Sequence, residues 1–100
     1  MALKLEQDYE YKGGDWWEWA VWIDAPDEEL DAIEYVEYVL HSTFSKPVRE
    51  ISDRSTKFRL ETAGWGCFTI YAKAFLKNGG IVEMEHELSL AYPDGTLTLA

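Results

Sequence analysis

Apolar and polar residues alternate in short segments along nearly the whole chain, and this pattern restricts the fold more than any other feature. A period of two places successive side chains on opposite faces of a sheet, so each segment predicts a strand with one buried face. A tryptophan-rich segment adds a further strand, because aromatic and β-branched residues favour extended backbone. The predicted strands cover residues 3–11, 16–24, 57–61, 68–74, 82–90 and 96–99.

Sequences typical of turns separate these segments. They are Gly13-Gly14, Ala25-Pro26-Asp27, Lys77-Asn78-Gly79-Gly80 and Pro93-Asp94-Gly95. Turn signals at such intervals predict an all-β fold, a β-sandwich of seven or eight strands.

The segment from residue 27 to residue 40 is compatible with two structures. Four of its residues approximate one face of a helix, and its charged residues are good helix formers. These four are Leu30, Ile33, Glu37 and Leu40. Val36, Tyr38 and Leu40 also alternate as in a strand. Periodicity alone leaves both structures open.

Length and charge limit the classes of protein to consider. One hundred residues predict a single domain spanning residues 1–100. Nineteen acidic residues against nine basic ones give a formal net charge of −10. We therefore expect no binding to nucleic acid or to anionic membranes, and attraction for a basic partner. Solubility alone explains the charge equally well.

The chain shows no targeting or membrane signal. Its first residues lack the apolar stretch of a signal peptide, and no apolar run approaches the ~20 residues needed to span a bilayer. We therefore expect no membrane insertion and a cytoplasmic location. The single cysteine, Cys67, excludes an internal disulfide, which fits a reducing compartment.

Two strings join aromatic rings to polar or glycine neighbours at predicted strand ends. They are LHSTF (residues 40–44) and AGWGCF (residues 63–68). Loops at strand ends carry binding groups because the rigid sheet positions them. Neither string has the residues needed to make or break bonds, but together they could form a slot between two aromatic faces. The pattern predicts recognition and not catalysis.

The order and spacing of these strings resemble the YEATS domain family, over roughly residues 19–90. The carriers of the resemblance are LHxxF, a proline-bearing connector, a strand and then G-W-G-x-F. Supporting positions are Trp19, Pro47, Phe58, Leu60 and His86-Glu87-Leu88. The compact connector and the tryptophan-rich front are more similar to the prokaryotic YEATS branch.

This resemblance implies an immunoglobulin-like sandwich, with a turn near residues 27–31 followed by a strand that leads into His41. The expected core contains Trp19, Val21, Phe58, Leu60, Ile70, Leu88 and Leu90.

The resemblance also implies a binding site for acylated lysine, formed by His41, Thr43, Phe44, Gly64, Trp65, Gly66 and Phe68. In YEATS readers the rings at the positions of Phe44 and Trp65 flank the flat acyl-amide. By the same likeness Thr43 contacts that amide, His41 orients the hydroxyl, and Phe68 closes the end of the slot. The backbone N–H of Trp65 could bind the acyl oxygen.

Each of these residues also has a structural interpretation. Phe44 and Trp65 are equally compatible with an ordinary core, His41 with a buried histidine bonded to backbone, and the glycines with a tight turn.

Other functions remain as alternatives. One is a protein–protein interaction or sensor sandwich that does not read acyl-lysine. A weaker one is carbohydrate binding through exposed tryptophans, since strand alternation places Trp17 and Trp19 on one face and Trp16 and Trp22 on the other. Cys67 and the two histidines match no nucleophile or metal-ligand spacing. We therefore expect no enzyme activity, no cofactor and no metal.

Overall fold

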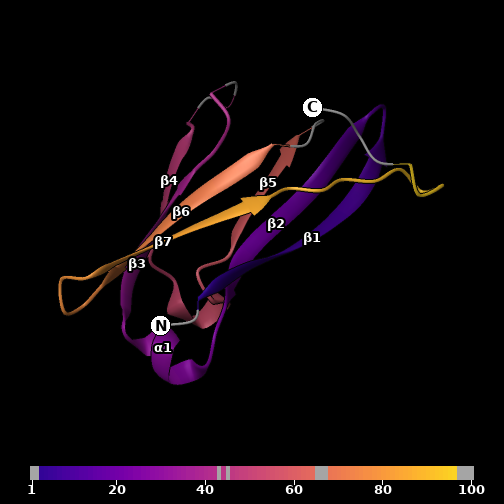
Figure 1. The fold of residues 1–100 in the computed structure, drawn as a ribbon. Helices are drawn as coiled ribbons and strands as arrows, with labels where there is room; N and C mark the ends of the chain where they lie inside the picture. Colours follow the sequence, from indigo (N-terminus) through magenta and orange to yellow (C-terminus); the bar gives the residue numbers. More distant parts are fainter. Residues whose placement is uncertain (1–2, 43, 45, 65–67, 97–100) are drawn as a thin grey trace.

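The computed structural model describes residues 3–42, 44, 46–64 and 68–96, which form two antiparallel sheets (Figure 1). One sheet has the strand order β1-β2-β5 and the other β4-β3-β6-β7. The elements are β1 (Lys4–Gly13), β2 (Trp16–Asp24), α1 (Asp27–Asp31), β3 (Ile33–Val39), β4 (Val48–Ile51), the 3-10 turn η1 (Arg54–Thr56), β5 (Leu60–Gly64), β6 (Thr69–Leu76) and β7 (Ile81–Glu87). The prediction of an all-β, immunoglobulin-like sandwich is confirmed.

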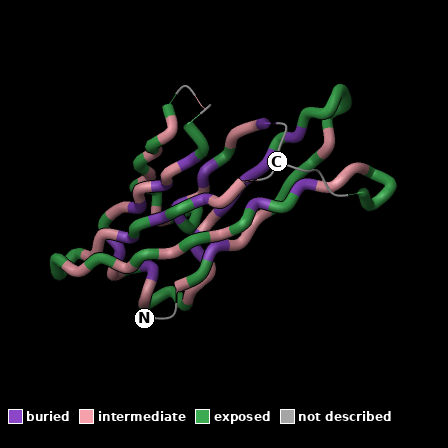
Figure 2. Tube along the Cα trace, turned by 45° about the horizontal axis from the view of Figure 1, so that its top comes forward, coloured by how far each residue is buried: buried purple, intermediate pink, exposed green. Residues whose placement is uncertain are grey.

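The core lies between the two sheets, where the apolar residues of each strand face inward. Figure 2 shows how buried and exposed residues alternate along the trace. In β6, Ile70, Ala72 and Ala74 are buried while Tyr71 and Lys73 are exposed. All seven residues predicted for the core are buried: Trp19, Val21, Phe58, Leu60, Ile70, Leu88 and Leu90.

The four tryptophans of β2 follow the predicted alternation. Trp17 and Trp19 are 0% and 3% exposed, whereas Trp16 is 45% exposed on the opposite face. Trp22 is half-buried because the guanidinium of Arg59 lies over its ring, 5.0 Å from the centroid. Packing within the sandwich therefore accounts for two of the four rings.

The segment that was open to two interpretations forms a short helix and then a strand. Helix α1 spans five residues, and β3 follows directly with Ile33, Val36 and Tyr38 buried. The strand is favoured because β3 pairs with a strand on each side. Val36 lies opposite Ile51 of β4 and Ala74 of β6, and Tyr38 lies opposite Arg49 and Ala72 of the same two strands. The turn-then-strand expected from the family resemblance is correct.

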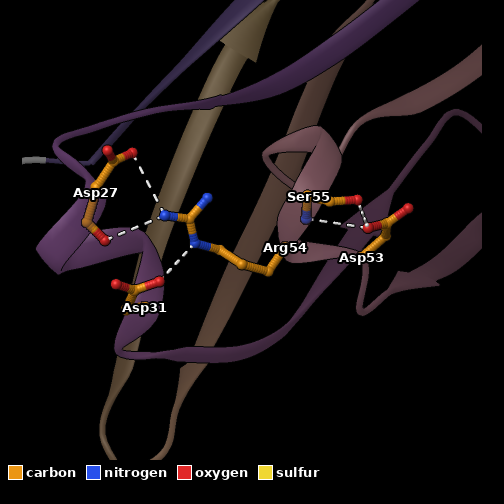
Figure 3. Close-up of polar contacts among 5 residues, drawn as sticks. All are labelled: Asp27, Asp31, Asp53, Arg54 and Ser55. Atoms are coloured by element: carbon orange, nitrogen blue, oxygen red, sulfur yellow. Dashed lines mark hydrogen bonds and ion pairs between the residues drawn. The ribbon is translucent and has the colours of Figure 1, made fainter.

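Arg54 ties α1 to the turn η1 (Figure 3). Its Nε donates to Asp31 Oδ1 at 2.8 Å, and its Nη2 lies 3.4 Å from Asp27 Oδ1. The hydrogen bond to Asp31 and the two carboxylate charges raise the pKa of Arg54. In η1 itself Asp53 accepts hydrogen bonds from Ser55. These contacts fix the end of the sandwich that carries α1.

One predicted strand begins later than expected. Lys57 and Phe58 have φ of 59° and 58°, in the left-handed region that bulky residues rarely adopt, so β5 starts at Leu60. Tertiary contacts hold this backbone. The Phe58 side chain is fully buried, its N–H donates to Asp53 O at 3.0 Å, and its carbonyl accepts from the Tyr38 hydroxyl at 2.6 Å. The alternation seen at residues 57–59 was therefore misleading.

The remaining differences lie at strand ends. Strand β4 was not predicted, and β7 ends at Glu87, although Leu88 and Leu90 still point into the core. Thr96 follows the turn at Pro93-Asp94-Gly95 but lies in no strand. The rest of the predicted last strand, residues 97–99, falls outside the described residues.

The Gln7 side chain joins the two sheets where β1 meets the end of β7. Its Nε2 donates to Ser89 O at 2.7 Å, and its Oε1 accepts from Ser89 N at 3.1 Å. The same Oε1 lies 2.6 Å from His86 Nε2. Because an amide oxygen only accepts, this nitrogen of His86 carries the proton. Burial lowers the pKa of His86, while Glu6 and Glu87 oppose that shift.

Candidate functional site

The two aromatic strings meet at one end of the sandwich. The first follows β3, where the N–H of Leu40 donates to Pro47 O at 2.6 Å and that of Phe44 donates to His41 O at 3.0 Å. The second begins at the end of β5. The ring centroids of Phe44 and Phe68 lie 5.5 Å apart at an interplanar angle of 55°. Both side chains are half-buried.

Trp19 provides a third ring beneath this pair. Its centroid lies 6.2 Å from Phe44 at 88° and 5.8 Å from Phe68 at 69°. The exposed His41 ring lies 6.1 Å from Phe68 at 62°. Such edge-to-face arrangements set the positive edge of one ring against the negative face of another. The result is an aromatic cluster of Trp19, Phe44, Phe68 and His41, which we call the aromatic end.

Gly64 borders the aromatic end at the last position of β5. It is buried, and it pairs with Trp17 of β2. A Cβ added at Gly64 would lie 3.5 Å from Trp19 Nε1 and 3.6 Å from Phe44 Cζ. These are ordinary contact distances, so a side chain longer than alanine would extend between the indole and the phenyl ring. A glycine at this position therefore places no side chain between these two rings.

The structure brings four of the seven predicted site residues together: His41, Phe44, Gly64 and Phe68. Thr43, Trp65 and Gly66 lie outside the described residues, as does Cys67. The predicted pairing of Phe44 and Trp65 across a slot therefore remains a prediction.

Sequence reasoning missed the part that Trp19 takes in this cluster. The family resemblance correctly placed its ring in the core. No pattern predicted that the ring also contacts both strings, since that contact depends on how the two loops fold over the sheet. Trp17, two residues earlier on the same face, contacts Tyr11 and Tyr92 instead.

A second surface of interest crosses the outer face of the β1-β2-β5 sheet. The residues that line an open groove there include the acidic Asp8, Glu10, Glu18 and Glu61 and the basic Arg59, which pairs with Glu61. In the described part of the chain, no group of three or more His, Cys, Asp or Glu could hold a metal ion. No helix among the same residues is long and apolar enough to cross a membrane.

Comparison with known proteins fits this geometry. The fold is that of a small sandwich of two antiparallel sheets, with the two loops at one end. The model of the prokaryotic YEATS domain matches residues 17–89, and the chain belongs to this family. The comparison with curated proteins gave no match.

Solved YEATS domains share the fold. The yeast AF-9 homolog Yaf9 aligns with a TM-score of 0.67 and 25% identity, over 92% of this chain and 66% of that one. The Yaf9 YEATS domain recognising an H3K122suc peptide aligns with a TM-score of 0.66 and 26% identity, over 88% of this chain and 68% of that one. The same domain bound to H3K27ac aligns with a TM-score of 0.66 and 24% identity, over 96% of this chain and 73% of that one. At this identity the likeness supports the fold alone.

Proposed function

We propose that this domain is a non-enzymatic reader that binds an acylated lysine of a basic peptide at the aromatic end. One observation carries the proposal: the two strings of the family motif converge, with Phe44 and Phe68 5.5 Å apart and Gly64 beside Phe44. YEATS domains are reader modules, and the similar Yaf9 YEATS domain recognises an H3K122suc peptide.

The chemistry of the aromatic end suits a flat, neutral group. Rings attract an acyl-amide through dispersion and desolvation. The charged ammonium of unmodified lysine would lose its hydration among these rings, which is costly. On this proposal Trp65 is the second flanking ring, Thr43 contacts the amide, and the N–H of Trp65 binds the acyl oxygen between Gly64 and Gly66.

Charge supports a basic peptide as the carrier of the acyl group. The chain has a formal net charge of −10, and the carboxylates of the outer groove add to a negative field around the domain. Such a field speeds the approach of a cationic partner and weakens as salt is added.

A second candidate is an interaction or sensor sandwich that does not read acyl-lysine. The half-buried Phe44 favours it, because this ring packs against the core. Carbohydrate binding is less favoured, because Arg59 covers one face of Trp22. No described ring contact joins Trp16 to Trp22.

An NMR titration separates these functions. We would add acetyl-lysine, crotonyl-lysine and unmodified peptides of the same basic sequence to ¹⁵N-labelled protein. Acyl reading predicts that the amide signals of His41, Phe44, Gly64 and Phe68 move with the two acyl peptides only. Equal shifts with all three peptides would favour an interaction surface. Shifts confined to Asp8, Glu18 and Glu61 would move the site to the outer groove.

A further inference from the structure

Trp19 carries a buried hydrogen-bond donor without a partner. The side chain is 3% exposed, and its Nε1 is the one buried side-chain nitrogen or oxygen of the described chain that lacks a hydrogen bond. Other buried donors are satisfied: Trp17 Nε1 donates to Ala91 O at 2.9 Å and the Tyr38 hydroxyl to Phe58 O at 2.6 Å. Native proteins rarely leave such a group unpaired, so each exception calls for an explanation.

The position of this N–H indicates where its partner would come from. It lies 3.5 Å from where a Cβ of Gly64 would stand, and that point is 3.6 Å from Phe44 Cζ. The donor therefore lies at the aromatic end, beside Gly64 and Phe44. The rings of Phe44 and Phe68 offer only π faces, which accept an N–H more weakly than an oxygen does.

We propose that Trp19 Nε1–H donates a hydrogen bond to a neutral oxygen on the acyl chain of the ligand, which makes the site selective for hydroxyacyl-lysine. This inference rests on the proposed function and names the ligand class. The amide oxygen is assigned to the N–H of Trp65, so the oxygen bound by Trp19 is a second one, further along the acyl chain.

A hydrocarbon acyl chain would fit this site less well. It would exclude water from the Trp19 N–H and leave the donor unpaired, and sites built to hydrogen-bond a hydroxyl reject analogues that lack it. A carboxylate would also fit less well. The indole packs against two aromatic rings and lies beside Gly64, an apolar setting in which a carboxylate is costly to bury, and the chain is already strongly acidic.

The test compares three peptides that differ only in the acyl group: 3-hydroxybutyryl-lysine, butyryl-lysine and succinyl-lysine. Dissociation constants are measured by calorimetry. We expect the hydroxybutyryl peptide to bind roughly tenfold more tightly than the butyryl peptide, equivalent to about 1.4 kcal/mol. The succinyl peptide should bind more weakly than the hydroxybutyryl peptide.

Two variants test whether the preference for the hydroxybutyryl peptide depends on the indole N–H of Trp19. Trp19→Phe removes the N–H and should bring the hydroxybutyryl-to-butyryl ratio close to one. Trp17→Phe removes the neighbouring indole N–H, which is already bonded to Ala91, and should keep the ratio near ten. Because the ratio is taken within one protein, partial loss of stability affects both peptides alike.

The wild-type protein provides a readout that needs no variant. The indole ¹H–¹⁵N signal of Trp19 should move downfield and exchange more slowly with water on addition of the hydroxybutyryl peptide, while that of Trp17 stays in place. Acyl peptides that bind with equal affinity and leave the Trp19 signal unchanged would overturn this inference and leave the proposed function standing. Failure of all three peptides to bind would overturn both.

Discussion

The two ends of the sandwich pair their polar groups differently. At the end that carries α1, Arg54 bridges to Asp31, and the buried Tyr38 hydroxyl donates to Phe58 O. At the aromatic end, rings from β2 and the two loops pack against one another, and the indole N–H of Trp19 has no partner within the described structure. One end is closed by its own contacts, and the other keeps a buried donor unused.

This difference separates stability from recognition. A region stabilises the fold when its hydrogen bonds and packing are all satisfied within the protein. Groups that are left unsatisfied are expected at functional sites. The unpaired donor and the glycine beside it are two such departures at the same place. Substitutions at the α1 end should therefore change the free energy of unfolding, and substitutions at the aromatic end should change ligand affinity.

The largest effect is expected for Phe58→Ala. This side chain is fully buried, so its truncation should lower the free energy of unfolding by about 3–5 kcal/mol through lost burial and a cavity. Urea denaturation measures the change. Phe44→Ala is the matched aromatic truncation and should cost less, because Phe44 is only half-buried. If the two variants lose the same free energy of unfolding, the two ends of the sandwich do not differ in their contribution to stability.

Phe44→Ala should instead reduce binding of an acyl-lysine peptide by about 2 kcal/mol or more, roughly 30-fold in Kd, as the loss of an aromatic anchor does. We expect a similar loss for Trp65→Ala and a smaller one, near 0.5–1.5 kcal/mol, for Thr43→Ala. Calorimetry on folded variants checks these values. Phe75→Ala is the control, since Phe75 stacks on Tyr35 near the other ends of β6 and β3, with the two ring centroids 4.6 Å apart. If it weakens binding as much, the aromatic end is not the site.

A moderate effect of pH is expected at His86. Burial puts its pKa in the folded protein below the usual 6.5, so the unfolded chain binds more protons over that interval. The free energy of unfolding should therefore fall as the pH drops from about 7 through 6.5 toward the folded-state pKa. Thermal unfolding at several pH values measures the slope.

His86→Gln should flatten that slope, because the variant has no titrating group at this position. His41→Gln is the control, since it removes the histidine of the aromatic end and leaves the contact between His86 and Gln7 in place. An unchanged slope in His86→Gln would assign the pH dependence to other groups.

The smallest effect is expected for Arg54→Met. Its ion pairs with Asp27 and Asp31 lie at the surface, where such pairs contribute little. We expect Tm to fall by no more than about 4 °C, and by less in 1 M salt, which screens the pairs. A double-mutant cycle with Asp31→Asn isolates the contact. A fall of 10 °C or more would mean that Arg54 holds the fold through something other than these pairs.

Alternation predicted most of the sheet because strands buried on one face require it. It failed at Lys57 and Phe58, where a buried ring and the hydrogen bond to Tyr38 impose a left-handed backbone that no local pattern reveals. It also left residues 27–40 open, because the five residues of α1 are too few to show a helical period.

Of the predicted site, the structure places the ring of Phe44 beside that of Phe68 at one end of the sandwich. That the two loops bind an acyl-lysine remains a prediction. The unused donor of Trp19 was beyond prediction. Trp17 and Trp19 lie on the same face of β2, and only the packing determines that one indole reaches Ala91 and the other does not.

The Gln7 amide has a consequence for aggregation. Chains that leave backbone N–H and C=O groups unpaired along a strand edge can add a strand from another molecule. Here a single side chain takes both backbone groups of Ser89, in the manner of one peptide unit of a neighbouring strand. Just past the end of β7, those two groups are therefore closed to a foreign strand.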